Sequence, residues 1–348
     1  MKIAIDAMGG DFAPENIVGG AKLALESIKR IDTLYLTGPE AELKKIVDAQ
    51  GLPASKVEIV DAPELVEMNE SGAKAVRRKK RSSISVATDL VKHGTCSGVM
   101  SAGNTGAAVA AATVKLRNLP GVERAGIASP LPNEHGTCNI IDAGANPDAK
   151  ANHLLQYGIM GSVYAKYALG VDSPRIGLMS VGTEDEKGTE FTREVFGLLK
   201  DSHLNFIGNV EGHDLFEKPV DVIVCDGFVG NVVLKSCEGT AYAMFKWLKQ
   251  ELTVSPLRML GAKLAKGAFR SVKKRASAES YGGCPLLGVN GVCIIAHGSS
   301  TPTAAMNAIR IAVEAVSHEV NPHIEEEIAR HNVPSKGGEN AAQVPANA

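Results

Sequence analysis

The chain lacks an excess of charge of either sign. Its 37 basic and 39 acidic residues give a formal net charge of -2, with a pI near 6.5, so no overall basic field favours a nucleic-acid partner. Paired cysteines are missing too, because the six cysteines are scattered, with no C-x-x-C pair and no ligand-like spacing to histidine. This pattern predicts buried thiols in a reducing compartment and implies no metal site.

Long apolar runs are also absent. No stretch approaches the ~18–20 apolar residues that span a bilayer, and the opening "MKIAIDAMGG" enters a strand and a turn directly, so we expect no secretory signal. The composition is 44% hydrophobic and 22% charged. Together these features predict a cytoplasmic globular protein.

Common signatures of nucleotide binding and hydrolysis are missing. The sequence contains no G-x-x-x-x-G-K-[ST], no helix-opening G-x-G-x-x-G, no H-E-x-x-H and no G-x-S-x-G. These absences disfavour kinase, dinucleotide-binding, zinc-protease and α/β-hydrolase functions. A dehydrogenase with an unusual cofactor loop stays open as an alternative.

What the chain does have is glycine, 36 residues of it, and a repeated order of strand, glycine-containing turn and helix. This order predicts an α/β fold with a mostly parallel sheet and helices on both faces. Residues 1–332 form the expected core, as one or two lobes around a cleft, and 333–348 a disordered polar tail. The expected strands are "KIAID", "TLYLTG", "GVMSAG", "NIIDAGAN", "RIGLMSVGTEDE", "NFIGNVEG", "VDVIVCDGFVGN" and "GVCIIAHGSS".

The stretch "VMSAGNTGAAVAAA" surrounds one polar turn with residues that have almost no side chain. Ligands bind beyond the carboxyl ends of parallel strands, and small residues let the backbone approach an anion there. The turn predicts a phosphate or substrate site formed by Ser101, Gly103, Asn104, Thr105 and Gly106. The alternative is an ordinary turn with a small-residue packing face.

The stretch "SVGTEDEKGTEFTRE" follows another expected strand. Thr183 and Glu186 have the spacing of a helix capping box. A metal site at Glu184, Asp185 and Glu186 is a weaker alternative, because no partner ligands are identifiable. Lys187 either binds phosphate as a point charge or forms a surface ion pair.

Two basic segments stand out. The first is the run Arg77, Arg78, Lys79, Lys80 and Arg81, which is either a solvated face or a dock for an acidic partner. The second is the 255–277 segment, with seven basic residues and no acid. It predicts an amphipathic helix near 257–275 that contacts anionic lipid, packs on its own core or joins a dimer. Its apolar face is Leu257, Leu260, Leu264, Ala268 and Val272, and its basic residues include Lys263, Lys266, Arg270, Lys273 and Lys274.

Six motifs, taken together and in order, resemble the bacterial acyl-ACP:phosphate acyltransferase (PlsX) family over residues 1 to about 332. They are "KIAIDAMGGDFAPENIVGG", "MSAGNTGA", "IDAGAN", "LMSVGTEDEKGTE", "CDGFVGN" and "YGGCPLLGVNGVCIIAHGSS". The resemblance implies transfer of a fatty acyl group from acyl carrier protein to inorganic phosphate, without a cofactor. It also implies a fold akin to phosphotransacetylase and isopropylmalate dehydrogenase, and a homodimer. The product, an acyl-phosphate, would serve a membrane glycerol-3-phosphate acyltransferase.

The resemblance gives the candidate residues roles. Asn104, Lys187 and His297 are the expected catalytic residues, His297 being alternatively a structural strand-end histidine. The substrate contacts also include Ser101, Thr105, Thr183, Ser299 and Ser300, while Asn146, Asp226 and Asn231 order the crevice. Residues 77–81 would receive the carrier protein, and the 255–277 segment would hold the enzyme at the inner face of the cell membrane. A CoA-dependent phosphotransacetylase and a non-catalytic membrane scaffold are the rival functions.

Overall fold

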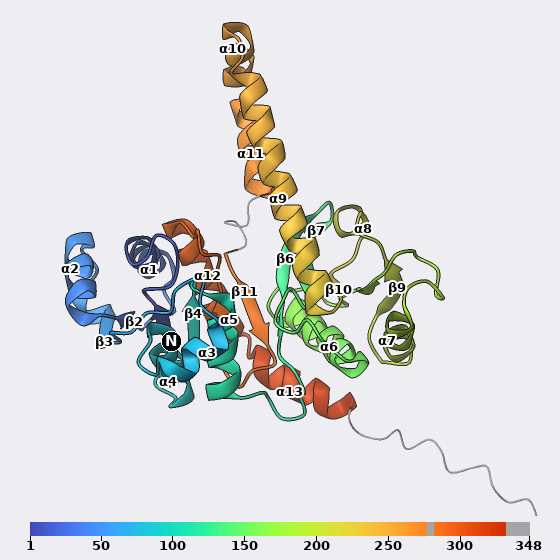
Figure 1. The fold of residues 1–348 in the computed structure, drawn as a ribbon, viewed down its shortest axis with the longest axis horizontal. Helices are drawn as coiled ribbons and strands as arrows, with labels where there is room; N and C mark the ends of the chain where they lie inside the picture. Colours follow the sequence, from blue (N-terminus) through green and yellow to red (C-terminus); the bar gives the residue numbers. More distant parts are fainter. Residues whose placement is uncertain (277–281, 332–348) are drawn as a thin grey trace, which may run out of the picture.

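The computed structural model describes residues 1–276 and 282–331, with side chains up to residue 272 and from 282 onward. These residues form two sheets covered by helices (Figure 1). In spatial order the first sheet is β3 (Val57–Asp61), β2 (Thr33–Gly38), β1 (Lys2–Asp6), β4 (Gly98–Ser101), β12 (Val292–Ile295), β11 (Cys284–Leu287) and β5 (Gly126–Ile127). The second is β6 (Ser129–Asn133), β7 (Gly136–Ile141), β10 (Val222–Val224), β8 (Ile176–Met179) and β9 (Phe206–Val210).

The helices follow the expected alternation with the strands. They are α1 (Glu15–Ser27), α2 (Glu40–Gln50), α3 (Gly72–Arg78), α4 (Ser83–Lys92), α5 (Thr105–Ala111) with a π-helical end (Ala112–Leu116), α6 (Ala151–Tyr167), α7 (Glu190–Lys200), α8 (Asp214–Glu217), α9 (Gly227–Leu252), α10 (Pro256–Leu264), α11 (Lys266–Ala276), α12 (Pro302–Ser317) and α13 (Val320–His331), with a short 3-10 turn at Ala54–Lys56. The predicted α/β class is confirmed. The predicted tail at 333–348 lies outside the described residues.

Strand direction decides where the turns gather. In the first sheet β1 pairs in parallel with β2 and β4, and β4 with β12. Only the β11 pairings with β12 and β5 are antiparallel there. In the second sheet β7, β10, β8 and β9 are parallel. The turns that follow β1, β4 and β12 therefore share one edge, and those that follow β7, β10 and β8 share another.

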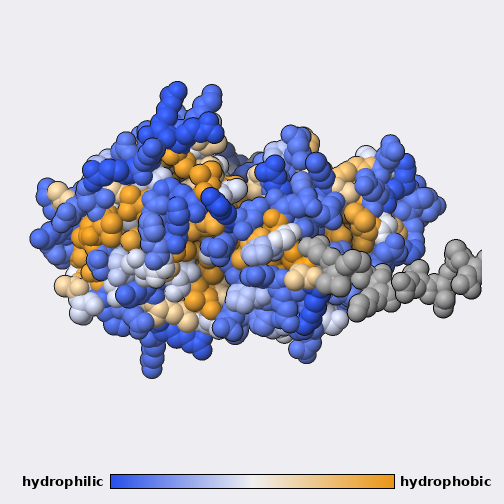
Figure 2. All heavy atoms as spheres, turned by 90° about the horizontal axis from the view of Figure 1, so that it is seen from below, coloured by the Kyte–Doolittle hydropathy of each residue, from blue (hydrophilic) through white to orange (hydrophobic). Residues whose placement is uncertain are grey.

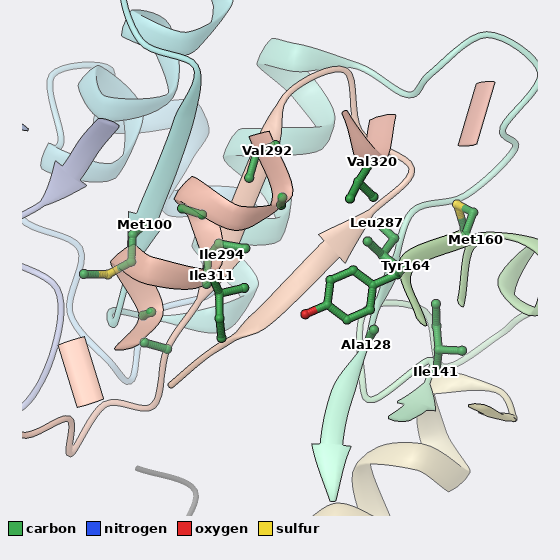
Figure 3. Packing of buried hydrophobic residues seen from close by; sticks show 14 of the residues in the cluster. Met100, Ala128, Ile141, Met160, Tyr164, Leu287, Val292, Ile294, Ile311 and Val320 are labelled. Atoms are coloured by element: carbon green, nitrogen blue, oxygen red, sulfur yellow. The ribbon is translucent and has the colours of Figure 1, made fainter. Parts of the chain in front are cut away.

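The two edges adjoin where β5 passes into β6. The amide of Ile127, at the end of β5, donates to Oδ1 of Asp142 at 3.0 Å, just beyond β7. One buried apolar cluster also runs through both sheets, with Met100 and Ile294 from the first and Ile141 from the second (Figure 3). This shared core holds the two carboxyl edges in a fixed relation.

An arm of three helices leaves the body. Only the first turn of α9 is buried, at Gly227 and Gly230, and its 26 residues correspond to a length of about 39 Å. Figure 1 shows α9 running outward, with α10 at the far end and α11 returning beside it. In contrast, the face of the body opposite the arm is mostly hydrophilic, with apolar patches among charged side chains (Figure 2).

Candidate active site

Three strand-end turns of the first sheet pack directly against one another. A Cβ on Gly9 would lie 2.7 Å from the backbone nitrogen of Gly103, and one on Gly10 would lie 3.0 Å from the carbonyl oxygen of Gly298. The amide of Asp11 donates to that same oxygen at 2.8 Å. Glycine is therefore required at the β1 turn because the β4 and β12 turns leave no room for a side chain.

A buried acid that sequence reasoning missed organises the β4 turn. Asp6, the last residue of β1, accepts a hydrogen bond on Oδ2 from Oγ of Ser101 at 2.6 Å, and that hydroxyl accepts from the amide of Gly103 at 3.1 Å. Burial raises the pKa of Asp6, whose Oδ1 is unpaired beside a cavity of about 10 Å³. The Ser101 hydroxyl and the Gly103 amide thus form hydrogen bonds within the protein, and their contact with phosphate stays a prediction.

Asn104 is a positioning residue in this structure. Its Oδ1 accepts from the amide of Ala107 at 3.0 Å and so caps α5. Its Nδ2 donates to the carbonyl oxygens of Glu67, Met68 and Glu70 at 3.2, 3.0 and 2.9 Å. Every polar atom of the Asn104 side chain therefore has a partner within the protein, so the predicted direct catalytic role gains no support. Thr105 and Gly106, the next residues, are exposed.

His297 is exposed just after β12. Its Nδ1 accepts from the amide of Ser299 at 3.1 Å and lies 2.9 Å from the Ser299 hydroxyl. Because an amide nitrogen only donates, Nδ1 is the acceptor and the neutral ring carries its hydrogen on Nε2. Ser300 is buried, its hydroxyl donates to the carbonyl of His297, and its own carbonyl accepts from Asn16 of α1 at 3.1 Å.

A second buried acid, also missed from the sequence, organises the edge of the second sheet. Besides Ile127, the carboxylate of Asp142 accepts from three consecutive amides: Oδ1 from Gly144 and Ala145 at 3.0 and 2.9 Å, and Oδ2 from Asn146 at 2.7 Å. The side chain is completely buried. An aspartate at the carboxyl end of a buried strand was the available signal: Asp142 follows β7 directly, and Asp6 is the last residue of β1.

The predicted residues near Asp142 make structural contacts. Nδ2 of Asn146 donates to the carbonyl of Ala125 and to the hydroxyl of Tyr157 at 2.9 Å. Asp226 caps α9. Asn231, one turn into α9, is exposed, and its Cγ would lie 3.4 Å from a Cβ on Gly144. The turns after β7 and β10 are therefore joined, and the exposed Asn231 packs its side chain beside Gly144.

Lys187 lies in the exposed loop between β8 and α7. Helix α7 begins at Glu190 and is capped by the Thr189 hydroxyl, so the predicted capping box at Thr183 and Glu186 is wrong. Thr183 is instead an exposed loop residue. Sequence spacing misplaced this cap because two threonines precede α7, and only contacts distinguish them.

The acidic residues of this loop do not converge on a metal. Asp185 forms an ion pair with Lys200 at 3.0 Å, and the carbonyl of Glu184 accepts from Nδ2 of Asn209 at 2.7 Å. Within residues 1–276 and 282–331 no group of three potential ligands is found. In the same ranges Lys187 has no ion-pair partner, which leaves its ammonium available.

The candidates thus fall into three groups. Asn104 and His297 belong to packed turns of the first sheet, Asn146 and Asn231 to the second, and Lys187 to a separate loop. No hydrogen bond or ion pair joins one group to another in the part of the chain that the structure describes. The three groups lie at the adjoining carboxyl edges of the two sheets, the edge at which ligands of parallel sheets bind.

The basic run is only partly free. Lys79 pairs with Glu70 and donates to the carbonyl of Leu65 at 2.6 Å, and Arg81 pairs with Asp61 at 2.7 Å. Arg77, Arg78 and Lys80 are exposed. A docking surface on this run would therefore consist of those three residues.

The arm corrects the prediction of one helix over 257–275. The segment forms α10 and α11, separated at Ala265, and the apolar face is exposed, with Leu257 at 79% and Leu264 at 82%. The packing of this face on the protein's own core is thereby excluded. A groove of about 520 Å³ lies between α9 and the returning helices, lined by Phe245, Met259 and Phe269 among others. The side chains of Lys273 and Lys274 lie outside the described residues.

The cysteines are not candidates for a thiolate nucleophile. All six are free, and four are buried. Burial raises the pKa of Cys96 and Cys293 to about 12, far above the ~8.5 of an ordinary thiol. The prediction of buried thiols is confirmed for those four cysteines, whereas Cys237 and Cys284 are only partly buried.

Comparison with known proteins identifies the family. The family described as "Fatty acid synthesis protein" matches residues 1–323. A phosphate acyltransferase of Akkermansia muciniphila is 59% identical, covering 95% of this chain and 96% of the relative. One from Pelotomaculum thermopropionicum is 50% identical, covering 97% and 98%. The chain belongs to this phosphate acyltransferase family. It is an acyltransferase.

Solved structures of phosphotransacetylases share the family's fold. One from Streptococcus pyogenes has a TM-score of 0.61 at 17% identity, covering 91% of this chain and 94% of that one. A branched-chain phosphotransacylase from Enterococcus faecalis has a TM-score of 0.56 at 15% identity, covering 91% and 99%. The expected likeness to the phosphotransacetylase fold is confirmed. No helix in the described ranges has the length and apolar character to span a membrane.

Proposed function

We propose that this phosphate acyltransferase moves a long-chain fatty acyl group from acyl carrier protein to inorganic phosphate, releasing acyl-phosphate for phospholipid synthesis. The observation that carries the proposal is the near full-length likeness to phosphate acyltransferases within a fatty acid synthesis family. The polar turns on two adjoining carboxyl edges support it, because they offer a site for an anion without a nucleotide motif.

The reaction asks little of the protein in acid–base chemistry. An oxygen of the hydrogen phosphate dianion forms a bond to the thioester carbonyl carbon, giving a tetrahedral oxyanion. The carbon–sulfur bond then breaks, and the proton lost by phosphate ends on the departing thiolate. Phosphate is already anionic and a thiol has a pKa of ~8.5, so alignment and oxyanion donors supply most of the acceleration.

Exposed residues are assigned the direct roles. The Nε2 hydrogen of His297 donates to the carbonyl oxygen or to the leaving sulfur, since Nδ1 is held by Ser299. Lys187 neutralises phosphate charge, and Thr105 and Asn231 contact phosphate or the acyl donor. Asp6, Asp142, Asn104, Asn146 and Asp226 hold the turns in place through the hydrogen bonds described above.

Carrier docking is assigned to the exposed part of the basic run. Acyl carrier protein is acidic, and Arg77, Arg78 and Lys80 form a basic patch at the end of α3. Electrostatic complementarity of this kind mainly accelerates encounter and fixes orientation. The same helix abuts the β4 turn, because a Cβ on Gly72 would lie 2.2 Å from the backbone of Gly106.

The arm is assigned to the membrane. Leu257, Leu260 and Leu264 are exposed, and Lys263, Lys266 and Arg270 flank them in the sequence. Such a helix inserts its leucines among acyl chains while its basic residues meet anionic headgroups. Peripheral attachment of a homodimer at the inner membrane face would release acyl-phosphate next to the membrane glycerol-3-phosphate acyltransferase that consumes it.

The test follows loss of thioester from palmitoyl-loaded acyl carrier protein with and without inorganic phosphate. We expect phosphate-dependent loss with acyl-phosphate formed, and lower turnover for folded Lys187→Ala and Asn104→Ala. Reaction of palmitoyl-CoA but not of the loaded carrier protein would replace the proposal by a CoA-dependent phosphotransacetylase. Vesicle binding without any turnover would indicate a membrane scaffold.

A further inference from the structure

In the 64–70 segment, between β3 and α3, two acids and two apolar residues are placed opposite to the usual order, while Glu67 is exposed and Val66 packs on the core. Glu64 and Glu70 are partly buried, whereas Leu65 and Met68 are 38% and 48% exposed. A surface loop normally turns its acids to water and its apolar side chains inward. The reversal indicates that the exposed apolar side chains are there to be contacted.

The acids of the segment anchor it to the protein. Oε2 of Glu64 accepts from the amide of Arg81 at 2.7 Å, and Glu70 pairs with Lys79 and accepts from the amide of Glu67 at 2.9 Å. Together with the three hydrogen bonds from Asn104, these contacts hold both ends of the segment and its centre. Residues 64–70 thus form a fixed surface, called the wall below, on which Leu65 and Met68 remain exposed.

The wall reaches the proposed reaction site at Met68. Its Cε lies 2.9 Å from the point that a Cβ on Gly298 would occupy, and Gly298 stands between His297 and Ser299. The amide of Asp11 donates to the carbonyl oxygen of Gly298, and both carboxylate oxygens of Asp11 lie 3.4 Å from the same Cβ point as Met68. The next residue, Phe12, is 58% exposed. The side chain of Met68 therefore adjoins the turn that carries His297, and Phe12 is the exposed apolar residue that follows Asp11 at the same turn.

We infer that Met68, with Phe12, binds the hydrocarbon chain of the acyl donor and sets its preferred length, and that Asn104 positions Met68 for this. The inference rests on the proposed function and deepens it. A thioester carbonyl at His297 continues into an apolar chain, and the apolar surface that continues from His297 is Met68. The unbranched methionine side chain adapts to a flexible alkyl chain.

The expected size of the effect follows from burial of methylene groups. Each methylene moved from water onto an apolar surface strengthens binding by about fourfold. A palmitoyl chain extends across the wall, whereas an octanoyl chain offers fewer methylenes to it. Shortening the side chain of Met68 should therefore lower kcat/KM for the palmitoyl donor more than for the octanoyl donor.

The experiment measures kcat/KM with palmitoyl- and octanoyl-loaded acyl carrier protein at saturating phosphate. We expect Met68→Ala and Met68→Gln to lower the palmitoyl value by about tenfold and the octanoyl value much less. Met68→Leu, which conserves volume and apolarity, should stay close to the wild type. Leu169→Ala is the matched control, because Leu169 is 43% exposed and precedes β8 at the amino end of the strands of the second sheet.

A readout independent of turnover separates this inference from the proposed function. Equilibrium binding of the two loaded carrier proteins should show the same loss of palmitoyl preference in Met68→Ala. If binding discriminates chain length through Met68 while no phosphate-dependent turnover occurs, the proposed function fails and the inference stands. Equal losses for both donors, or none, overturn the inference, and equal losses would indicate instead that the wall contacts the carrier protein.

Discussion

Replacement of Asp142 by asparagine tests whether one buried carboxylate organises the edge of the second sheet. Asparagine has nearly the same shape but offers one acceptor oxygen instead of two. If that oxygen keeps the amides of Ile127, Gly144 and Ala145, the new NH₂ group faces the amide of Asn146, which now lies 2.7 Å from Oδ2. Two donors then oppose each other in a buried place.

The magnitude follows from these four hydrogen bonds. Three lose charge assistance, each worth about 1 kcal/mol more than a neutral bond, and an unpaired buried amide costs about 1–3 kcal/mol. Part of this lost stability is recovered, because the neutral asparagine avoids the cost of burying a charge. We expect Asp142→Asn to lower the free energy of unfolding by about 3 kcal/mol.

Urea denaturation followed by circular dichroism measures this loss. Asp226→Asn is the matched control, since Asp226 lies on the neighbouring turn and caps α9, and asparagine caps a helix about as well as aspartate does. A loss for Asp142→Asn within about 0.5 kcal/mol of the control would refute the reasoning, because charge-assisted bonds differ from neutral ones by more than that.

Further predictions concern three other regions. Burial raises the pKa of Asp6 above its ordinary value of 3.8. The contribution of the protonated carboxyl to the free energy of unfolding is therefore complete below pH 3.8 and is lost as the pH rises through the raised pKa. In urea titrations the free energy of unfolding of Asp6→Asn should therefore rise relative to that of the wild type as the pH increases from 4 to 7. A difference between the two proteins that does not change with pH would contradict this. Arg77→Glu with Arg78→Glu should raise KM for acyl carrier protein, most at low salt, and leave kcat unchanged. Leu257→Asp with Leu264→Asp should abolish sedimentation with anionic vesicles, without loss of folding, because both side chains are exposed.

The strands that local sequence predicts are mostly buried on both faces, and the edge strand β9 is the partly buried exception. Each of the eight apolar runs contains a strand, because valine and isoleucine runs between helices are the local signature of a covered parallel sheet. The strands without a predicted counterpart include β5 with two residues, and β6 and β11, which contain proline. Proline is tolerated at sheet edges, and β5 and β6 are edge strands. The order of strands depends on contacts between distant segments, which local patterns do not encode.

The sequence predicts where the candidate site lies, but it does not predict which side chains support the fold and which face a ligand. Sequence indicated which turns leave the strands at their carboxyl ends, and these turns do share adjoining edges. The partner of Ser101, however, is 95 residues away at Asp6, and the carbonyls held by Asn104 are 34 to 37 residues away. Hydrogen bonds across such separations decide whether a polar side chain supports the fold or faces a ligand.

This division has a consequence for the chemistry. The small residues of the turns leave room for one turn to pack on another, so most of the buried polar groups are consumed in holding the backbone. The groups left exposed include a ring nitrogen of His297, the ammonium of Lys187 and the amide of Asn231. We therefore expect substitutions at these three residues to lower turnover without a change in stability, and substitutions at Asp6 or Asp142 to lower both. The two kinds of residue both belong to strand ends or the loops that follow them and differ in burial and in their hydrogen bonds, so paired measurements of turnover and unfolding distinguish them.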